Sequence, residues 1–243
     1  MKTKHAILVG IFVGASVFPE GYGVTFEDVV FWVGSGTKRA ALVVDWNDGV
    51  FPESFVWGYR WDGVATGLEM LQAVVESDSR LFAHVSEPGP FGTAVYGIGY
   101  DQNGNGSFGV TPGLEFNAGG WSIGVPDDHR RAGEDGDRWA EGWNLGFWGY
   151  YVKEPGAEEW TVALTGPSDR ILADGAWDGY SFAPGFRFSE PSGAAPAPVP
   201  EPEVYALMCV GVLVLLGKTM GRFNAGTTAG RPTRGWSDRA RLS

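Results

Sequence analysis

One short loop has the residue types and spacing of a calcium ligand set. Asp101, Asn103 and Asn105 place oxygen-bearing side chains at positions 1, 3 and 5 of the run 101–106, and a glycine stands at position 6. Calcium takes about six to eight oxygen ligands, and the glycine permits the sharp turn that brings them together. The pattern predicts calcium binding through the first half of an EF-hand-like loop.

The second half of that loop departs from the pattern. Position 12 is Pro112 instead of a bidentate glutamate, so the missing charge must come from elsewhere, for instance from the acidic 127–137 loop. Asn and Gly are also ordinary turn residues. A plain Gly/Asn turn without a metal is therefore the alternative interpretation.

Carboxylates beside tryptophans form the second candidate site, a ligand surface made of Asp45, Asp48, Trp57, Trp61 and Asp62. An acid and a base flanking a glycosidic bond would hydrolyse it. The same groups could instead hydrogen-bond sugar hydroxyls while an indole stacks on the ring. The remaining interpretation is structural, with the acids capping turns and the aromatic rings filling the core.

Other catalytic chemistry has little support. His84 and His129 are the only histidines outside the N-terminal segment, too few for a transition-metal cluster without carboxylate help. The single cysteine, Cys209, lies in an apolar run near the C-terminus, which excludes a cysteine nucleophile in the body. No Gly-x-Ser-x-Gly elbow or phosphate loop occurs. The sequence predicts no catalytic residue.

The elements that would position these residues are mostly strands. Glycine is abundant, aromatic residues are frequent, and short apolar runs alternate with turn residues, which is typical of β-rich proteins. We expect an all-β body, a β-sandwich or jelly roll with one short α-helix, and an α+β layer fold as the alternative. The strands are predicted over 26–33, 40–45, 54–61, 92–100, 145–152, 160–165 and 182–188, with a long loop over 119–138.

The single helix has a clear start. Thr66 and Glu69 form a capping box, and apolar residues at helical spacing follow, which predicts a helix over about 67–77. A Trp-Gly-Tyr motif also recurs at Trp57 and Trp148, and Trp-Asp-Gly-Tyr begins at Trp177. The irregular period indicates reused strand and turn chemistry, not a repeat architecture.

Both ends of the chain predict export. Residues 1–18 combine early lysines with a short apolar stretch, as in a signal peptide. A β-rich extracytoplasmic domain over 20–190 follows, and then a Pro/Ala linker over 191–200. Residues 200–222 contain an apolar run over 204–217 that reaches 18 residues if it extends to Gly221, against about 20 for a full membrane span. We expect a membrane helix here, and a buried core helix is the alternative. A basic tail over 223–243 completes the chain.

The C-terminal segment resembles the PEP-CTERM sorting signal of bacterial surface proteins. The resemblance rests on Pro200, Glu201 and Pro202, on the hydrophobic helix after them, and on the basic residues Lys218 and Arg222 that would stop transfer. It implies processing by a membrane-embedded exosortase, passage through the membrane, and a final location at the cell surface or outside the cell. The body is also similar to a domain of such proteins, on the segments 44–49, 57–63 and 96–101. That similarity implies no known activity.

Charge supports this division. Residues 20–203 hold 28 acidic and 10 basic side chains, a net charge of −18, whereas residues 218–243 hold six basic and one acidic, a net of +5. The acidic body disfavours nucleic acid as a partner. We therefore expect an exported, surface-sorted, non-enzymatic module that binds extracellular polysaccharide or matrix. The alternative is a secreted glycoside hydrolase that uses carboxylates.

Overall fold

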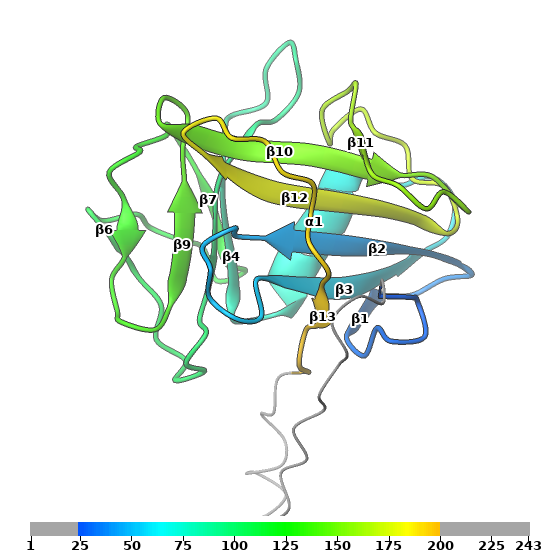
Figure 1. The fold of residues 1–243 in the computed structure, drawn as a ribbon, viewed down its shortest axis with the longest axis horizontal. Helices are drawn as coiled ribbons and strands as arrows, with labels where there is room; N and C mark the ends of the chain where they lie inside the picture. The colour runs from blue at the N-terminus through cyan, green and yellow to red at the C-terminus, as the bar shows by residue number, and fades with distance from the viewer. Residues whose placement is uncertain (1–23, 200–243) are drawn as a thin grey trace, which may run out of the picture. The chain divides into compact units, whose positions relative to one another are not determined.

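The computed structural model describes residues 24–199, which form one helix, α1, and thirteen strands (Figure 1). The helix spans Gly67–Ser77. The strands are β1 Trp32–Gly34, β2 Lys38–Asp45, β3 Ser54–Trp61, β4 Leu81–Val85, β5 Val95–Tyr100, β6 Val110–Thr111, β7 Trp121–Ile123, β8 Arg131–Ala132, β9 Arg138–Glu141, β10 Gly146–Lys153, β11 Thr161–Val162, β12 Ala176–Pro184 and β13 Ala195–Pro196.

Three open sheets make up the body. The largest has seven strands in the order β1-β3-β2-β12-β10-β11, with β13 also paired to β3. It is mixed, because β1 and β13 run parallel to β3 and β2 runs parallel to β12, while the other pairs are antiparallel. The second sheet has the order β7-β4-β5-β9, and β6 pairs with β8 alone. The prediction of a mostly β body with one short helix is confirmed.

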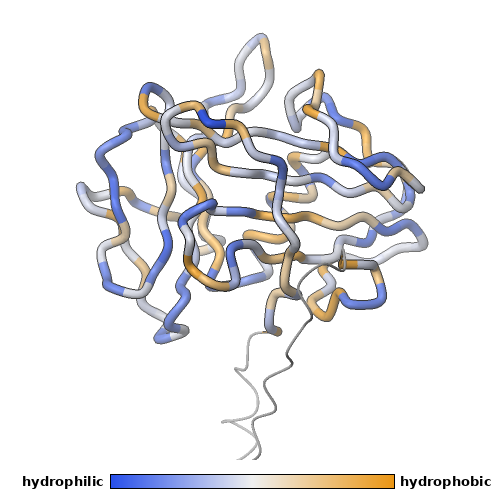
Figure 2. Tube along the Cα trace, in the orientation of Figure 1, coloured by the Kyte–Doolittle hydropathy of each residue, from blue (hydrophilic) through white to orange (hydrophobic). Residues whose placement is uncertain are grey.

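The central strands are buried on both faces, which explains their nearly continuous apolar sequence. In β2, Leu42 and Val44 join the main core, while Ala41 and Val43 belong to a smaller cluster on the other face. Figure 2 shows the apolar residues concentrated along these inner strands.

Two glycines allow rings to cover the outer face of the large sheet. A Cβ atom on Gly58 would lie 2.3 Å from the ring of Trp32, and one on Gly179 would lie 2.6 Å from Pro191. Both approaches are too close for any side chain. The repeated aromatic-glycine motifs therefore place a large ring on the core face and leave room on the other face for a covering group.

Helix α1 begins where its capping box predicts. Thr66 Oγ1 accepts a hydrogen bond from the Glu69 amide at 3.2 Å, and the Glu69 carboxylate accepts the Thr66 amide at 2.7 Å. Met70, Leu71 and Val74 are fully buried against the main core. The prediction for this element is confirmed to the residue at its N-terminus, because both signals are local.

Several strand predictions differ from the structure. The strands over 40–45 and 54–61 and the hairpin of β10 and β11 are confirmed, whereas the closing strand lies at 176–184 instead of 182–188. Strand β4 was not expected, and the predicted 119–138 loop contains β7 and β8. Short strands of two or three residues carry too little alternation to be recognised in sequence.

The Pro/Ala segment predicted as a linker lies along the large sheet. Ala195 and Pro196 pair with β3, and the Ala197 amide donates to the Val56 carbonyl at 3.0 Å. Ala197 is fully buried. Small residues can approach the sheet edge closely, so this stretch belongs to the folded body through Ala197.

Candidate functional site

A pocket of about 260 Å³ opens over β10 and β12, and six of its twelve lining residues are aromatic. Its volume is near the lower end for small-molecule sites, about 300–1,000 Å³, so it suits one ring-sized group. The lining residues are Phe91, Gly92, Thr93, Ala94, Val95, Trp143, Phe147, Trp148, Tyr150, Gly166, Pro167 and Tyr180.

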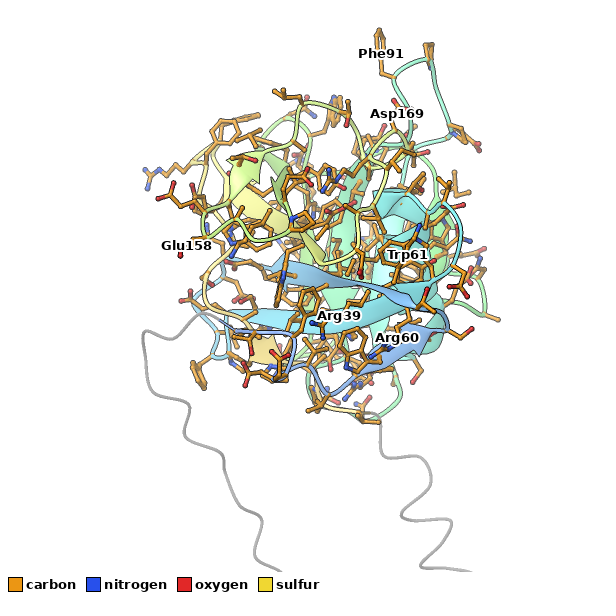
Figure 3. The ribbon with its side chains drawn as sticks, turned by 90° about the vertical axis from the view of Figure 1, so that its right-hand side faces the viewer. Arg39, Arg60, Trp61, Phe91, Glu158 and Asp169 are labelled. Carbon is orange, nitrogen blue, oxygen red and sulfur yellow. The ribbon has the colours of Figure 1, made fainter. Side chains whose placement is uncertain are left out.

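Two loops form the rim of this pocket on one side. The Thr93 amide donates to Ser168 Oγ at 3.0 Å, which ties the β4–β5 loop to the loop before β12. Figure 3 shows Phe91 at the tip of the first loop. Its side chain is 93% exposed. The rim therefore offers an apolar ring to solvent from a loop that is itself held in place.

Two stacked tyrosines form the floor. Tyr150 and Tyr180 face each other across β10 and β12, with ring centroids 5.0 Å apart. The Tyr150 hydroxyl donates to Asp178 Oδ2 at 2.5 Å. The Tyr180 hydroxyl is buried and has no hydrogen-bond partner among the described residues. A buried hydroxyl without a partner is costly, so the floor has one unused polar group.

Asp178 is a fully buried carboxylate behind that floor. Burial raises its pKa to about 6, although the hydrogen bond from Tyr150 and the charge of Arg170 act against this rise. Arg170 is shared, because its Nη1 lies 2.5 Å from Glu154 while its Nε is 3.5 Å from Asp178. Desolvation therefore outweighs the compensation that Asp178 receives.

Trp143 forms the mouth of the pocket and is 53% exposed. Its ring packs edge-on against Tyr96 at 5.3 Å between centroids. Its amide donates to Asp128 Oδ1 at 2.8 Å. A half-exposed indole fixed from below can present a flat face to a ligand.

The predicted ligand surface does not come together in the structure. Trp57 and Trp61 are buried in the core, at 0% and 4% exposure. The Trp57 indole donates to Asp78 Oδ2 at 3.0 Å. These rings fill the interior between the large sheet and the helix, so they are not available to a sugar.

The three acids of that predicted surface cap turns. Asp45 is buried and accepts the amides of Asn47 and Ser192 at 2.8 and 2.7 Å. Asp48 accepts the Val50 amide at 2.9 Å. Asp62 accepts both the amide and the hydroxyl of Thr37, at 3.0 and 2.9 Å. The structural interpretation of these residues explains each contact.

The Asp101 loop is closed by its own hydrogen bonds. Asp101 is buried and accepts the amides of Gly104 and Gly106, at 2.7 and 2.9 Å. Asn103 and Asn105 each accept the amide two residues further on, at 2.9 and 2.7 Å. These contacts are those of a plain Gly/Asn turn.

The 127–137 loop does lie beside this turn. Asn103 donates to Asp137 Oδ1 at 3.0 Å, and Asn105 donates to Glu134 Oε2 at 2.8 Å. Burial and the nearby Asp101 raise the pKa of Asp137. Across residues 24–199, however, no group of three or more His, Cys, Asp or Glu side chains lies close enough to hold a metal ion.

The predicted sorting residues, Pro200, Glu201, Pro202, Lys218 and Arg222, lie outside the described residues, as does the predicted signal peptide. Within the described part of the chain, no helix combines the length and the apolar character needed to cross a membrane.

Sequence reasoning missed the pocket, although one signal pointed to its floor. The repeated motifs that begin at Trp148 and Trp177 lie on paired strands and overlap at Tyr150, which stands opposite Tyr180. No local pattern marks Phe91, Trp143 or Asp128, because their roles depend on contacts between loops far apart in sequence.

No family model, no curated protein and no solved structure matches the chain. A proposal about function therefore rests on the sequence and on the geometry described above.

Proposed function

We propose that the body is a non-enzymatic carbohydrate-binding module of an exported protein that is sorted to the cell surface. The observation that carries the proposal is the aromatic-lined pocket, with Trp143 half exposed at its mouth. A sugar ring has an apolar face of C–H groups and a rim of hydroxyls. Aromatic walls with a few polar groups suit such a ligand.

The polar groups near the pocket fit the same ligand class. Thr93 is a hydroxyl-bearing residue of the lining, whereas the Tyr180 side chain is 1% exposed and its hydroxyl is buried. The Tyr150 hydroxyl is already engaged by Asp178. The lining therefore favours a neutral ligand over an anionic one, because none of the described residues that line the pocket is basic.

Hydrolysis is less well supported than binding. Glycoside hydrolysis needs two carboxyl groups flanking the bond, and none of the described residues that line the pocket is Asp or Glu. Asp178 has the raised pKa of a general acid, but it is fully buried behind Tyr150. The secreted hydrolase remains the alternative, and its nearest carboxyl is Asp178.

The cellular part of the proposal rests on the sequence. The PEP-CTERM-like motif at Pro200–Pro202, with Lys218 and Arg222 after the apolar run, suggests an exosortase as a processing partner. The protein would be inserted in the membrane before it is sorted to the cell surface. A matrix polysaccharide outside the cell would then be the partner of the pocket. A sandwich-like or jelly-roll-like classification of the body belongs to the same proposal.

The test is a glycan-array screen of the full chain, followed by calorimetric titration of the strongest hit. We expect saturable binding that falls at least tenfold in Trp143→Ala. The matched control is Phe51→Ala, which removes a 90% exposed ring outside the pocket lining and should bind like the parent. Absence of binding to any neutral glycan, or equal binding by Trp143→Ala, would overturn the proposal.

A further inference from the structure

One carboxylate holds the whole turn that carries Trp143. Asp128 Oδ1 accepts the backbone amides of Trp143, Asn144 and Leu145, at 2.8, 2.9 and 2.9 Å. Its Oδ2 accepts the Asn144 side-chain amide at 2.9 Å. Three successive amides that converge on one oxygen form an anion-binding nest.

Asp128 is suited to this role because it is buried and ionised. It is 9% exposed. Although burial opposes ionisation, the hydrogen bonds from Leu145, Trp143 and Asn144 hold the pKa of Asp128 well below its usual range. Hydrogen bonds to an ionised acceptor are stronger than those between neutral groups.

The segment that carries Asp128 is itself anchored on both sides. The Asp127 amide donates to Glu141 Oε1 at 2.9 Å, and Arg130 Nη1 donates to the same oxygen at 2.8 Å. Glu141 is buried and also contacts His84 Nδ1 at 3.0 Å. The carboxylate of Asp128 is thus fixed relative to β9, the strand from which the Trp143 turn departs.

The turn has few other restraints near Trp143. Gly142 donates to the Tyr96 carbonyl at 3.1 Å, and the Leu145 carbonyl accepts the Gly185 amide at 2.7 Å. Between these two points, the backbone hydrogen bonds of residues 143 and 144 go to Asp128 alone among the described residues. The backbone of the turn that carries the indole therefore depends on this carboxylate, while the ring itself packs against Tyr96.

We propose that Asp128 is the positioning residue of the pocket, which fixes the Trp143 indole where a sugar ring stacks on it. The inference rests on the proposed function, since it assigns Trp143 as the stacking surface. Asp128 does not touch the ligand. It acts by ordering the indole before binding, so that little conformational entropy is lost when the complex forms.

The experiment compares Asp128→Ala and Asp128→Asn with Asp127→Asn in the full chain. Asp127 belongs to the same loop, and its side chain accepts the His129 amide instead of the Trp143 turn. Amide hydrogen exchange resolved by NMR should accelerate at least tenfold at residues 143–145 in Asp128→Ala and stay at the parent rate in Asp127→Asn. This readout needs no ligand.

The second readout is affinity for the strongest neutral oligosaccharide found on the glycan array. Asp128→Ala should weaken binding at least fivefold, and Asp128→Asn should weaken it less. In Asp128→Asn, the new amide would face the Asn144 amide group, donor against donor. The double variant Asp128→Asn with Asn144→Asp exchanges the two groups and should recover part of the affinity, which a general loss of stability would not.

The outcomes separate the two proposals. Loss of binding in Trp143→Ala with parent-like binding and exchange in both Asp128 variants would overturn the positioning role and leave the carbohydrate site standing. Parent-like binding in Trp143→Ala would overturn the proposed function. If Asp128→Ala fails to fold, Asp128→Asn and the double variant carry the test, and parent-like exchange at 143–145 in Asp128→Asn would overturn the positioning role.

Discussion

Two groups of aromatic residues in this body have opposite surroundings. The core aromatic group, which consists of Trp46, Phe55, Trp57 and Tyr100, is at most 4% exposed. The pocket aromatic group, which consists of Phe91, Trp143, Tyr150 and Tyr180, lines a cavity open to solvent. Both groups lie beside long strands of the large sheet. The difference is that helix α1 and the second sheet cover the first group, while loops carry Phe91 and Trp143, which are 93% and 53% exposed, at the open side of the second.

The buried carboxylates beside the two groups differ in the hydrogen bonds that they accept. Asp78 and Asp178 are both fully buried. Asp78 accepts the Trp57 indole at 3.0 Å, two hydrogen bonds from the Arg80 guanidinium at 2.9 Å each, and the Arg80 amide at 3.1 Å. Asp178 receives one from Tyr150 and a distant Arg170 at 3.5 Å. The two carboxylates therefore differ in how closely they are paired, whereas a buried hydroxyl without a partner among the described residues occurs in both regions, at Tyr100 in the core and at Tyr180 in the pocket floor.

Replacing a core aromatic should produce the largest effect. Trp57→Ala should lower the free energy of unfolding by about 3 to 5 kcal/mol, because it leaves a cavity and removes a partner of Asp78. Trp57→Phe keeps most of the volume and should cost less. Urea denaturation measures both. A loss below about 1 kcal/mol in Trp57→Ala would mean that this ring is not a core element.

The pocket floor should give a pH-dependent stability. The pKa of Asp178 is raised to about 6, so the folded state holds this proton more tightly than the unfolded state. The contribution of Asp178 to the free energy of unfolding should therefore be fully present below about pH 4 and fall as the pH rises through 6, by up to ~3 kcal/mol. Asp178→Asn cannot lose that proton, so the stability of the parent relative to this variant should fall over the same window. A difference that stays flat or grows with pH would contradict the assignment.

Removing the exposed ring at the pocket rim should weaken binding without changing stability. Phe91→Ala and Phe51→Ala remove rings that are 93% and 90% exposed, and each should change the free energy of unfolding by less than ~0.5 kcal/mol. Only Phe91 lines the pocket. Calorimetric titration with the array hit should show weaker binding for Phe91→Ala alone. Equal losses in both variants would indicate a general surface effect.

The smallest effect is expected at the Asp101 loop. Its side-chain oxygens already accept backbone amides, so the turn should keep its shape without a cation. Melting temperatures in millimolar calcium and in excess chelator should agree within about 1 °C. Calcium at about 100 times its Kd would add about 2.7 kcal/mol and raise the melting temperature by several degrees. Such a rise would establish the calcium site that the sequence pattern predicts.

The sequence predicts best those features whose causes are local. The capping box at Thr66 fixes the start of α1, and the long apolar runs of β2 and β3 identify the centre of the large sheet. The sequence places the closing strand too late in the chain, because Asp178 and Gly179 are poor strand residues. Their presence in β12 is explained only by tertiary contacts, of Asp178 with Tyr150 and of Gly179 with Pro191.

The candidate site depended on information that no local pattern contains. Trp57 and Trp61 looked as suitable for a ligand as Trp143, because residue type does not reveal which ring a second layer will cover. The pairing of Asp128 with the amides of 143–145 joins segments separated by up to 17 positions. Only the folded chain shows which tryptophan is exposed and which carboxylate holds it.

The central claim is that ligand binding belongs to the pocket aromatic group and not to the Trp57 region. Its most direct test is the affinity of Trp143→Ala for the neutral glycan that the parent binds most tightly. We predict at least a tenfold loss with a change in the free energy of unfolding below about 1 kcal/mol. Parent-like affinity in this variant, at unchanged stability, would contradict the claim.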